Sequence, residues 1–212
     1  MMNVNDKKSE PNPELENMMK KSVEFHGHSC PGLAIGVVAS KIALENAKRA
    51  EDEELVAVVE NDACGVDAIQ VLTGCTFGKG NLIYKDYGKS VYTFYNRTTG
   101  KALRLSVKPE TFSKTHGNKQ TELFEKVRSK TATEEEIAEH NRHRKERIRS
   151  ILEKGKDLFK IEEVEITPPE IARIFNDVIC ENCGEPVMAT KVQEISGKKL
   201  CIPCAEKKKY DG

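Results

Sequence analysis

The feature that most constrains the fold is a set of four cysteines near the C-terminus, spaced C-x2-C-x17-C-x2-C: Cys180, Cys183, Cys201 and Cys204. Two C-x-x-C pairs at this separation are typical of a four-cysteine zinc site, in which each pair supplies two thiolates to one tetrahedral ion. A segment this short buries too little apolar surface to fold alone, so the metal would supply the folding energy. We predict structural Zn2+; a rubredoxin-like iron site is the less favoured alternative.

The residues between the two pairs contain a Ser196-Gly197 turn, which predicts a hairpin, and the last pair opens a stretch suited to a short helix. A hairpin followed by a helix favours a treble clef, although the spacing alone leaves a zinc ribbon open. Lysines in this module could contact nucleic acid. Glutamates lie among them, however, and no aromatic platform accompanies them, so protein–protein contact or dimer bracing is expected at least equally.

The bulk composition excludes several classes of protein. Lys+Arg and Asp+Glu both number 34, so the net charge gives no overall attraction to nucleic acid or to an anionic membrane. No run approaches 18 apolar residues, and residues 1–20 lack the apolar centre of a signal peptide. We therefore expect a cytoplasmic protein with no membrane partner, in which reducing conditions favour metal ligation or catalysis by clustered cysteines over disulfides.

The order of the predicted elements indicates an α+β fold. Helical patterns come first and strand patterns later, which predicts helices packed on a largely antiparallel sheet. A Tyr87-Gly88 turn predicts that residues 81–88 and 89–97 pair as a hairpin, and Thr133 with Glu136 forms a capping box for a long helix. We assign residues 1–165 to this metal-binding core and 166–212 to a linker and the zinc finger. The expected helices are 14–24, 31–50, 64–74 and 134–159, and the expected strands are 54–61, 81–88, 89–97, 100–107 and 159–166.

A second group of ligand-type residues lies in "FHGHSCPG", where His26, His28 and Cys30 alternate. Alternate residues of an extended segment point to one side, so the three can converge. Cys30 precedes a predicted helix start, where the partial positive charge favours a thiolate, and Cys64 occupies the same position before the next helix. Together they predict a mixed nitrogen and sulfur site for a second transition metal, zinc, nickel or iron.

The same residues would serve catalysis if the protein is an enzyme. Cys64 or Cys30 would then be a thiolate nucleophile or a metal-bound group, and Asp67, Lys79 or a histidine would transfer protons. Asp67 is expected to lie one helical turn beyond Cys64.

The loop "GCTFGKGN" holds the third unassigned cysteine, Cys75, which could be a ligand or a buried core residue. Its Gly78-Lys79 pair is not a phosphate-binding loop, because the segment follows a helix and leads into a strand. Lys79 and Asn81 are expected to line a pocket beside the metal.

The helix over 134–157 carries seven acidic and seven basic side chains, which predicts a solvated helix with i,i+4 ion pairs. The alternative is a helix that crosses to a second subunit. His140 and His143 lie i,i+3 on it and could bind metal as a surface accident.

Three stretches, "FHGHSCPGLAIG", "ENDACGVDAIQVLTGCTFGKGNLIYKDYGK" and the tail with "CENCGE", resemble the FmdE family, which takes its name from a component of formylmethanofuran dehydrogenase. The resemblance implies a core of the FwdE/GAPDH-domain type, a C-terminal treble-clef zinc finger and an intertwined homodimer. It also implies a metal pocket that maps onto His26, His28, Cys30 and Cys64.

Three functions follow from these observations. The first is an accessory or metal-handling partner of a molybdenum or tungsten oxidoreductase in anaerobic one-carbon metabolism, which the family name suggests and which is connected with methanogenesis. The second is a stand-alone metal- or thiolate-dependent enzyme. The third is a metal-sensing regulator or adaptor whose zinc finger binds nucleic acid or protein.

Overall fold

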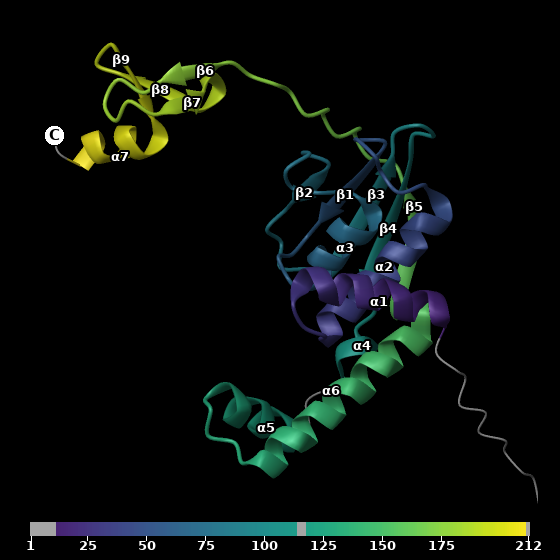
Figure 1. Cartoon of the computed structure of the whole chain (residues 1–212). Coiled ribbons are helices and arrows are strands. Elements are labelled where there is room, and N and C mark those ends of the chain that lie inside the picture. Colours follow the sequence, from purple (N-terminus) through teal and green to yellow (C-terminus); the bar gives the residue numbers. More distant parts are fainter. Residues whose placement is uncertain (1–11, 114–117, 211–212) are drawn as a thin grey trace, which may run out of the picture. The chain divides into compact units, whose positions relative to one another are not determined.

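The computed structural model describes residues 12–113 and 118–210, which divide into two compact units, one up to Ile171 and one from Ala172 onward. The first unit therefore extends past residue 165, where the sequence placed its end. Helices and a sheet form the first unit, and short strands with one helix form the second (Figure 1).

The first unit opens with two helices joined by a short turn. Helix α1 spans Pro13–His26, and Gly27 ends it in the left-handed conformation, with φ of 90°, which glycine adopts without steric cost. Helix α2 spans Pro31–Asn46 and begins with proline in its first turn, where the missing N–H costs no hydrogen bond. The predicted helices are confirmed, including α3, Gly65–Thr73.

The sheet has the strand order β2-β1-β3-β4-β5. Within it, β1 and β2 are parallel, and the other three pairs are antiparallel, which confirms the largely antiparallel prediction. The bounds are β1 Leu55–Val59, β2 Leu82–Tyr84, β3 Val91–Asn96, β4 Lys101–Val107 and β5 Phe159–Val164.

The predicted hairpin around Tyr87-Gly88 is wrong, because β1 lies between β2 and β3. All five residues of β1 are buried, as in a central strand, and its backbone groups need partners on both edges. The segment between β2 and β3 bonds to the end of β1 instead: Lys85 N–H donates to Val59 O and Lys89 N–H to Glu60 O.

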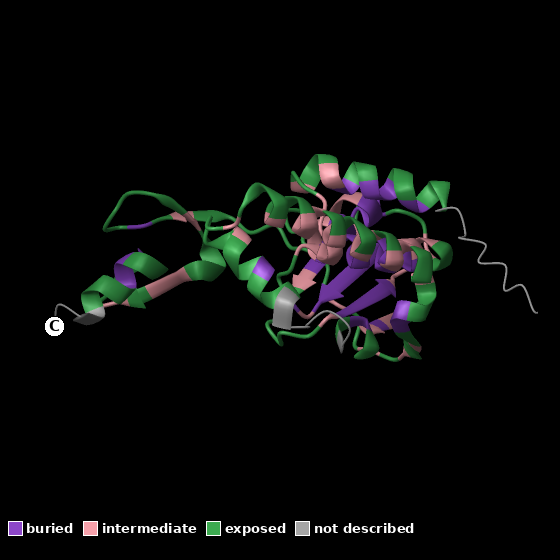
Figure 2. Cartoon of the chain, turned by 90° about the horizontal axis from the view of Figure 1, so that it is seen from below, coloured by how far each residue is buried: buried purple, intermediate pink, exposed green. Residues whose placement is uncertain are grey.

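One face of the sheet carries the main core. Leu55, Ala57 and Val59 of β1 pack with buried residues of α1, α2 and α3, and Figure 2 shows the buried residues concentrated on the strands and the helix faces above them. Val56 points to the opposite face, where a small cluster with Tyr95 and Ala102 forms. This alternation is the period of two expected of strands.

A helical arm follows β4. It consists of α4 (Glu110–Ser113), α5 (Asn118–Arg128), α6 (Glu134–Lys154) and the short 3-10 helix η1 (Gly155–Leu158). The predicted capping box of Thr133 and Glu136 is present in both directions. In Figure 1, α5 lies along the N-terminal half of α6, which extends away from the sheet. The C-terminal half of α6 packs on the core through Ile148, Ile151 and Leu152.

The end of the first unit is held by Arg97, at the turn after β3. Its guanidinium donates to the carbonyls of Glu53, Pro169 and Glu170 at 3.0, 2.7 and 3.0 Å. Five hydrogens in a planar fork allow one arginine to hold several carbonyls. The segment 165–176, which has no helix or strand, is thereby attached to the core at Pro169 and Glu170.

The second unit contains two small hairpins and a helix. Strands β6 (Asp177–Ile179) and β7 (Pro186–Met188) pair antiparallel, as do β8 (Val192–Ile195) and β9 (Lys198–Cys201). The 3-10 helix η2 (Ala189–Lys191) precedes β8, and α7 (Ile202–Tyr210) follows β9.

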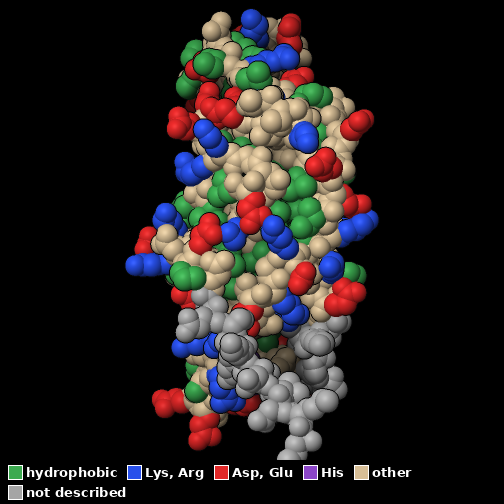
Figure 3. Space-filling view, turned by 90° about the vertical axis from the view of Figure 1, so that its right-hand side faces the viewer, with side chains coloured by type: hydrophobic (Ala, Val, Ile, Leu, Met, Phe, Trp, Pro, Cys, Tyr) green, Lys and Arg blue, Asp and Glu red, His purple; other side chains and the backbone are tan. Residues whose placement is uncertain are grey.

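Two surface properties bear on partners. Within residues 12–113 and 118–210, no helix has both the length and the apolar character needed to cross a membrane. On the face shown in Figure 3, acidic and basic side chains are interspersed, in keeping with the zero net charge.

Candidate metal centre

Three predicted ligands come together in the first unit. One ligand atom each from His26, Cys30 and Cys64 lies within 4.8 Å of the others. His26 ends α1, Cys30 is the N-cap of α2 and Cys64 is the N-cap of α3. Cys30 and Cys64 are distant in sequence, but they lie close together because the end of α1 and the starts of α2 and α3 converge.

A close approach of α2 and α3 sets this convergence. A Cβ built on Gly36 would lie 2.1 Å from the carbonyl oxygen of Gly65, and one on Gly32 would lie 3.4 Å from the Cβ of Cys64. Only glycine fits the backbone-to-backbone contact at Gly36, whereas the contact at Gly32 is an ordinary van der Waals distance from a side chain. The small residues on α2 thus allow Cys64 to lie next to the N-terminus that carries Cys30.

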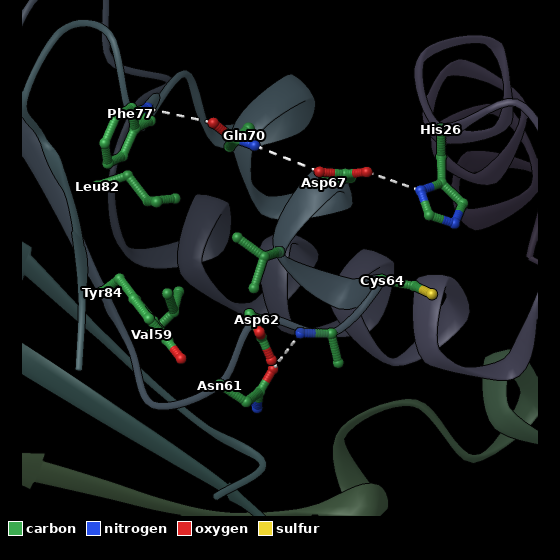
Figure 4. Close-up of a pocket in the computed structure, with 12 residues that line it drawn as sticks. His26, Val59, Asn61, Asp62, Cys64, Asp67, Gln70, Phe77, Leu82 and Tyr84 are labelled. Atoms are coloured by element: carbon green, nitrogen blue, oxygen red, sulfur yellow. Dashed lines mark hydrogen bonds and ion pairs between the residues drawn. The ribbon is translucent and has the colours of Figure 1, made fainter. Parts of the chain in front are cut away.

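Hydrogen bonds orient the imidazole of His26 (Figure 4). Its Nδ1 lies 2.7 Å from Oδ2 of Asp67. Asp67 also accepts from Gln70 Nε2 at 3.4 Å, and Gln70 Oε1 accepts from the N–H of Phe77 at 3.1 Å. A carboxylate that accepts from Nδ1–H leaves the lone pair of Nε2 free, which is the usual arrangement behind a metal-bound histidine.

The surroundings of His26 Nε2 show whether a metal ion fits this site. Nε2 of His26 is buried and has no hydrogen-bond partner within the part of the chain that the structure describes. A buried polar atom without a partner is rare and costly. A cation between Nε2 and the two thiols would satisfy it, and the donor set of one imidazole and two sulfurs suits zinc, nickel or iron.

The Cys30 thiol reflects its surroundings. Its sulfur accepts the N–H of Leu33 at 3.3 Å, as a capping side chain does. The pKa of Cys30 is raised to about 11, and burial of the thiol is the largest cause. The neighbouring Cys64 also raises this pKa, whereas the hydrogen bond from the Leu33 N–H lowers it. A metal ion would reverse this balance, since a bound cation favours the thiolate.

His28 does not belong to the cluster. Its ring centroid lies 4.4 Å from that of His26, yet it contributes no atom to the three-residue group. His28 and Cys30 instead line a separate cavity with residues of α5 and α6.

A cavity of about 370 Å³ opens beside the cluster and is lined by His26, Cys64 and Asp67. Its far wall includes Asn61, Phe77 and Tyr84 (Figure 4), which the sequence did not single out. Phe77 is 77% exposed. The signal that the sequence offered for it was an aromatic residue within a glycine-containing loop.

Lys79 and Asn81 are not brought to this site. The ammonium group of Lys79 donates to the carbonyls of Ala50, Glu51 and Asp52, and neither residue lines the cavity. Asn81 is fully buried and donates to Asp52 O in the loop before β1 at 3.0 Å and to Leu55 O at 2.9 Å. The carbonyls of the loop before β1 have no neighbouring strand to pair with, so the side chains of Lys79 and Asn81 supply their hydrogen-bond donors.

Cys75 is a core residue. It is fully buried, and its sulfur donates to the carbonyl of Leu55 at 3.3 Å. Burial raises its pKa to about 11, so the thiol stays neutral at ordinary pH. Of the two interpretations of this cysteine, the structure supports the buried position, away from the other two thiols.

The second unit brings its four cysteines together. Cys180, Cys183, Cys201 and Cys204 have sulfurs within 4.8 Å of one another, and Cys183 and Cys201 are 3.9 Å apart. Zinc–sulfur bonds of about 2.3 Å in a tetrahedron place sulfurs about 3.8 Å apart. Backbone N–H groups of Cys183, Cys201 and Asn182 lower the pKa of Cys180 to about 6, whereas the pKa values of Cys183 and Cys201 are raised. The spacing of the four sulfurs is therefore what suits the group to structural zinc.

Family models match both units. The model described as "FmdE, Molybdenum formylmethanofuran dehydrogenase operon" matches residues 25–160, and the one described as "Prokaryotic dksA/traR C4-type zinc finger" matches residues 173–210. The first covers more than half of the chain, and the second covers the four-cysteine module.

Two individual proteins are similar. A "Probable S-adenosyl-L-methionine-binding protein" of Archaeoglobus fulgidus is 39% identical over 202 residues, which are 92% of this chain but only 54% of that protein. The crystal structure of an FmdE-like protein of the tungsten formylmethanofuran dehydrogenase type, from Syntrophus aciditrophicus, is 26% identical, with a TM-score of 0.61, over 91% of this chain and 92% of that one. The chain thus spans about half the length of its curated relative.

Proposed function

The chain belongs to the FmdE family and carries a C-terminal four-cysteine zinc finger, and from this premise we propose that its core binds a second transition metal. His26, Cys30 and Cys64 would be the ligands. The protein would act as an accessory or metal-handling partner of a molybdenum or tungsten oxidoreductase of the formylmethanofuran dehydrogenase type, in anaerobic one-carbon metabolism.

One observation in particular supports the proposed metal site in the core. The imidazole of His26 is fixed by Asp67 so that a buried nitrogen, which has no partner among the described residues, lies beside two thiols. Nitrogen and sulfur donors held ready in this way match a metal site better than a packed core, because an apolar core would not retain a polar atom without a partner.

The test is the metal content of the anaerobically purified full chain, measured by inductively coupled plasma mass spectrometry. We expect two metals per chain in the wild type. His26→Ala and Cys64→Ala should each reduce the content to one, which is the zinc of the terminal module.

Matched controls are available in the same unit. Cys75→Ala removes a cysteine that lies outside the cluster and should retain both metals. His28→Ala removes the neighbouring imidazole and reports whether His28 joins the ligands when metal is bound. One metal per chain in the wild type, unchanged in the His26 and Cys64 variants, would contradict the core site.

An enzymatic role is the second candidate, and the number of ligands favours it. Three protein ligands leave one tetrahedral position for water or substrate, as in catalytic rather than structural zinc sites. The cavity of about 370 Å³ beside His26 and Cys64 offers room for that ligand, and Asp67 lies at its wall. In Co2+-substituted protein, added azide should change the visible spectrum; an unchanged spectrum would argue for a closed site.

Partners and location are proposed on separate grounds. We propose a homodimer built through the helical arm, where Phe112 of α4 and Ile137 of α6 are 42% and 41% exposed. Ile137→Glu should shift the mass measured by light scattering to that of a monomer. The seven free cysteines fit the cytoplasm.

The terminal module is proposed to be a treble clef, since a knuckle, a hairpin and a helix follow in that order. Its role is a protein contact. DNA or RNA retention at about 50 mM salt that falls as salt rises would instead favour the nucleic-acid regulator.

A further inference from the structure

The inward face of helix α6 changes character along its length. Its C-terminal half presents Ile148, Ile151 and Leu152 to the core. One to two turns earlier the same face carries His140, His143, Arg144 and Arg147, at positions i, i+3, i+4 and i+7. This spacing is the one that normally carries the apolar stripe of a surface helix, so basic residues here need a physical reason.

These residues face a cavity rather than the protein core. A cavity of about 460 Å³ is lined on one side by these four residues of α6, which we call the basic stripe. The rest of its lining includes His28, Cys30 and Pro31, before and at the start of α2, and Leu123 and Phe124 of α5. Its volume lies in the range of small-molecule sites. Among the described residues, no acidic side chain lines it; Glu139 and Glu146 lie 3.5 and 3.6 Å from His143 but are outside the lining.

Arg147 is held by a backbone carbonyl, and no acidic side chain among the described residues that line the cavity neutralises either arginine. Arg147 donates through Nη2 to the carbonyl oxygen of Thr111. Nε of Arg144 is buried and has no hydrogen-bond partner among the described residues. A guanidinium hydrogen withdrawn from water without an acceptor is destabilising, and two arginines on one helix face repel each other.

An anion would relieve both penalties. A carboxylate or phosphate group presents two oxygens that match the fork of a guanidinium. The N-terminus of α2, where Cys30 and Pro31 line the cavity, adds a partial positive charge. Leu123 and Phe124 offer an apolar surface for the rest of the ligand.

We propose that this cavity binds a small organic anion, with its carboxylate or phosphate on Arg144 and Arg147 and its apolar body against Leu123 and Phe124. The proposal goes beyond the metal site, because the basic stripe needs no metal. Cys30 nevertheless belongs both to this wall and to the three-ligand cluster, so the bound anion lies next to a candidate metal ligand.

The test uses the full chain and three probes of one shape: benzoate, phenyl phosphate and the uncharged benzyl alcohol. Titration followed by ligand-observed NMR should give saturable binding of at least one anion and none of the alcohol. The preferred anion identifies the headgroup. Arg144→Gln should weaken anion binding by about 10- to 100-fold, the usual effect of losing a charged hydrogen bond.

The controls separate this site from general charge and from the metal. Arg142→Gln removes an exposed arginine of the same helix that does not line the cavity and should leave binding unchanged. Arg144→Lys keeps the charge without the fork and should bind with intermediate affinity. Metal content, measured on each variant, reports separately on the core site.

Absence of binding by both anions, equal binding of benzyl alcohol, or equal losses in the Arg142 and Arg144 variants would overturn the proposal. The first two outcomes depend on the wild type alone, so a poorly folded variant cannot obscure them. Two metals per chain without anion binding would refute this inference and leave the proposed function standing.

Discussion

Substitution of Gly36 by alanine tests how the helix contact builds the metal centre. The new Cβ would lie 2.1, 2.6 and 2.7 Å from the O, Cα and C atoms of Gly65. Ordinary contact begins near 3.4 Å, so α2 and α3 must separate by roughly 1 Å, since neither backbone can yield locally. Cys30 and Cys64, at the starts of these helices, must separate with them.

The expected loss of stability is a difference of two effects. Overpacking against backbone should cost about 3 kcal/mol, and the better helix propensity of alanine should return about 1 kcal/mol. The net loss of about 2 kcal/mol corresponds to a decrease in the melting temperature of about 4–8 °C for a chain of this size. Metal affinity should fall as well, because ligand distances are held within about 0.2 Å in a good site.

Thermal unfolding followed by circular dichroism at 222 nm and metal content by mass spectrometry provide the two readouts. Gly78→Ala is the matched control: a Cβ added at Gly78 would meet nothing within 4 Å and its φ is ordinary, so both readouts should stay at wild-type values or rise slightly. If Gly36→Ala behaved like Gly78→Ala, the glycine contact would not be what positions the two thiols.

Three further predictions concern separate parts of the molecule. Asp67→Asn should weaken core metal binding by about 10- to 100-fold in competition with a chromogenic chelator, because His26 loses the carboxylate that orients it; unchanged affinity would remove Asp67 from the site. Zinc removal by a strong chelator should abolish hydrogen-exchange protection in residues 177–208, while protection in β1 and β3 persists; protection that survived in the terminal module would show that it folds without metal. Above pH 9 the free energy of unfolding should fall, because Cys75 has a pKa near 11 when folded and near 9 when unfolded. The contribution is fully present below pH 9 and is lost toward pH 11, on the order of 1 kcal/mol per pH unit; urea titrations of Cys75→Ala should show a smaller decline, and an identical decline would contradict the assignment.

The sequence was informative where local chemistry decides the structure. Proline at the start of α2, the capping box of Thr133 and Glu136, and the spacing of the terminal cysteines act over a few residues, so the corresponding elements could be predicted. The convergence of His26 with Cys30 and Cys64 was also anticipated, because both cysteines precede helices in the pattern.

Long-range pairing was harder to predict. A turn at Tyr87-Gly88 favours a hairpin locally, but β1 takes the position between its two strands because a fully buried strand needs neighbours on both edges. Lys79 resembled a pocket cation, yet unpaired carbonyls of residues 50–52 bind it. The basic stripe of α6 was visible as His140 and His143, but its meaning depends on α2 and α5, which are distant in sequence.

The attachment of Pro169 and Glu170 to Arg97 has an evolutionary consequence. Since Pro169 and Glu170 lie before the boundary between the two units at residue 171, recombination just after that boundary would keep the bonds that their carbonyls accept from Arg97. Gene fusion could therefore replace the terminal module in a lineage while the core keeps this anchor.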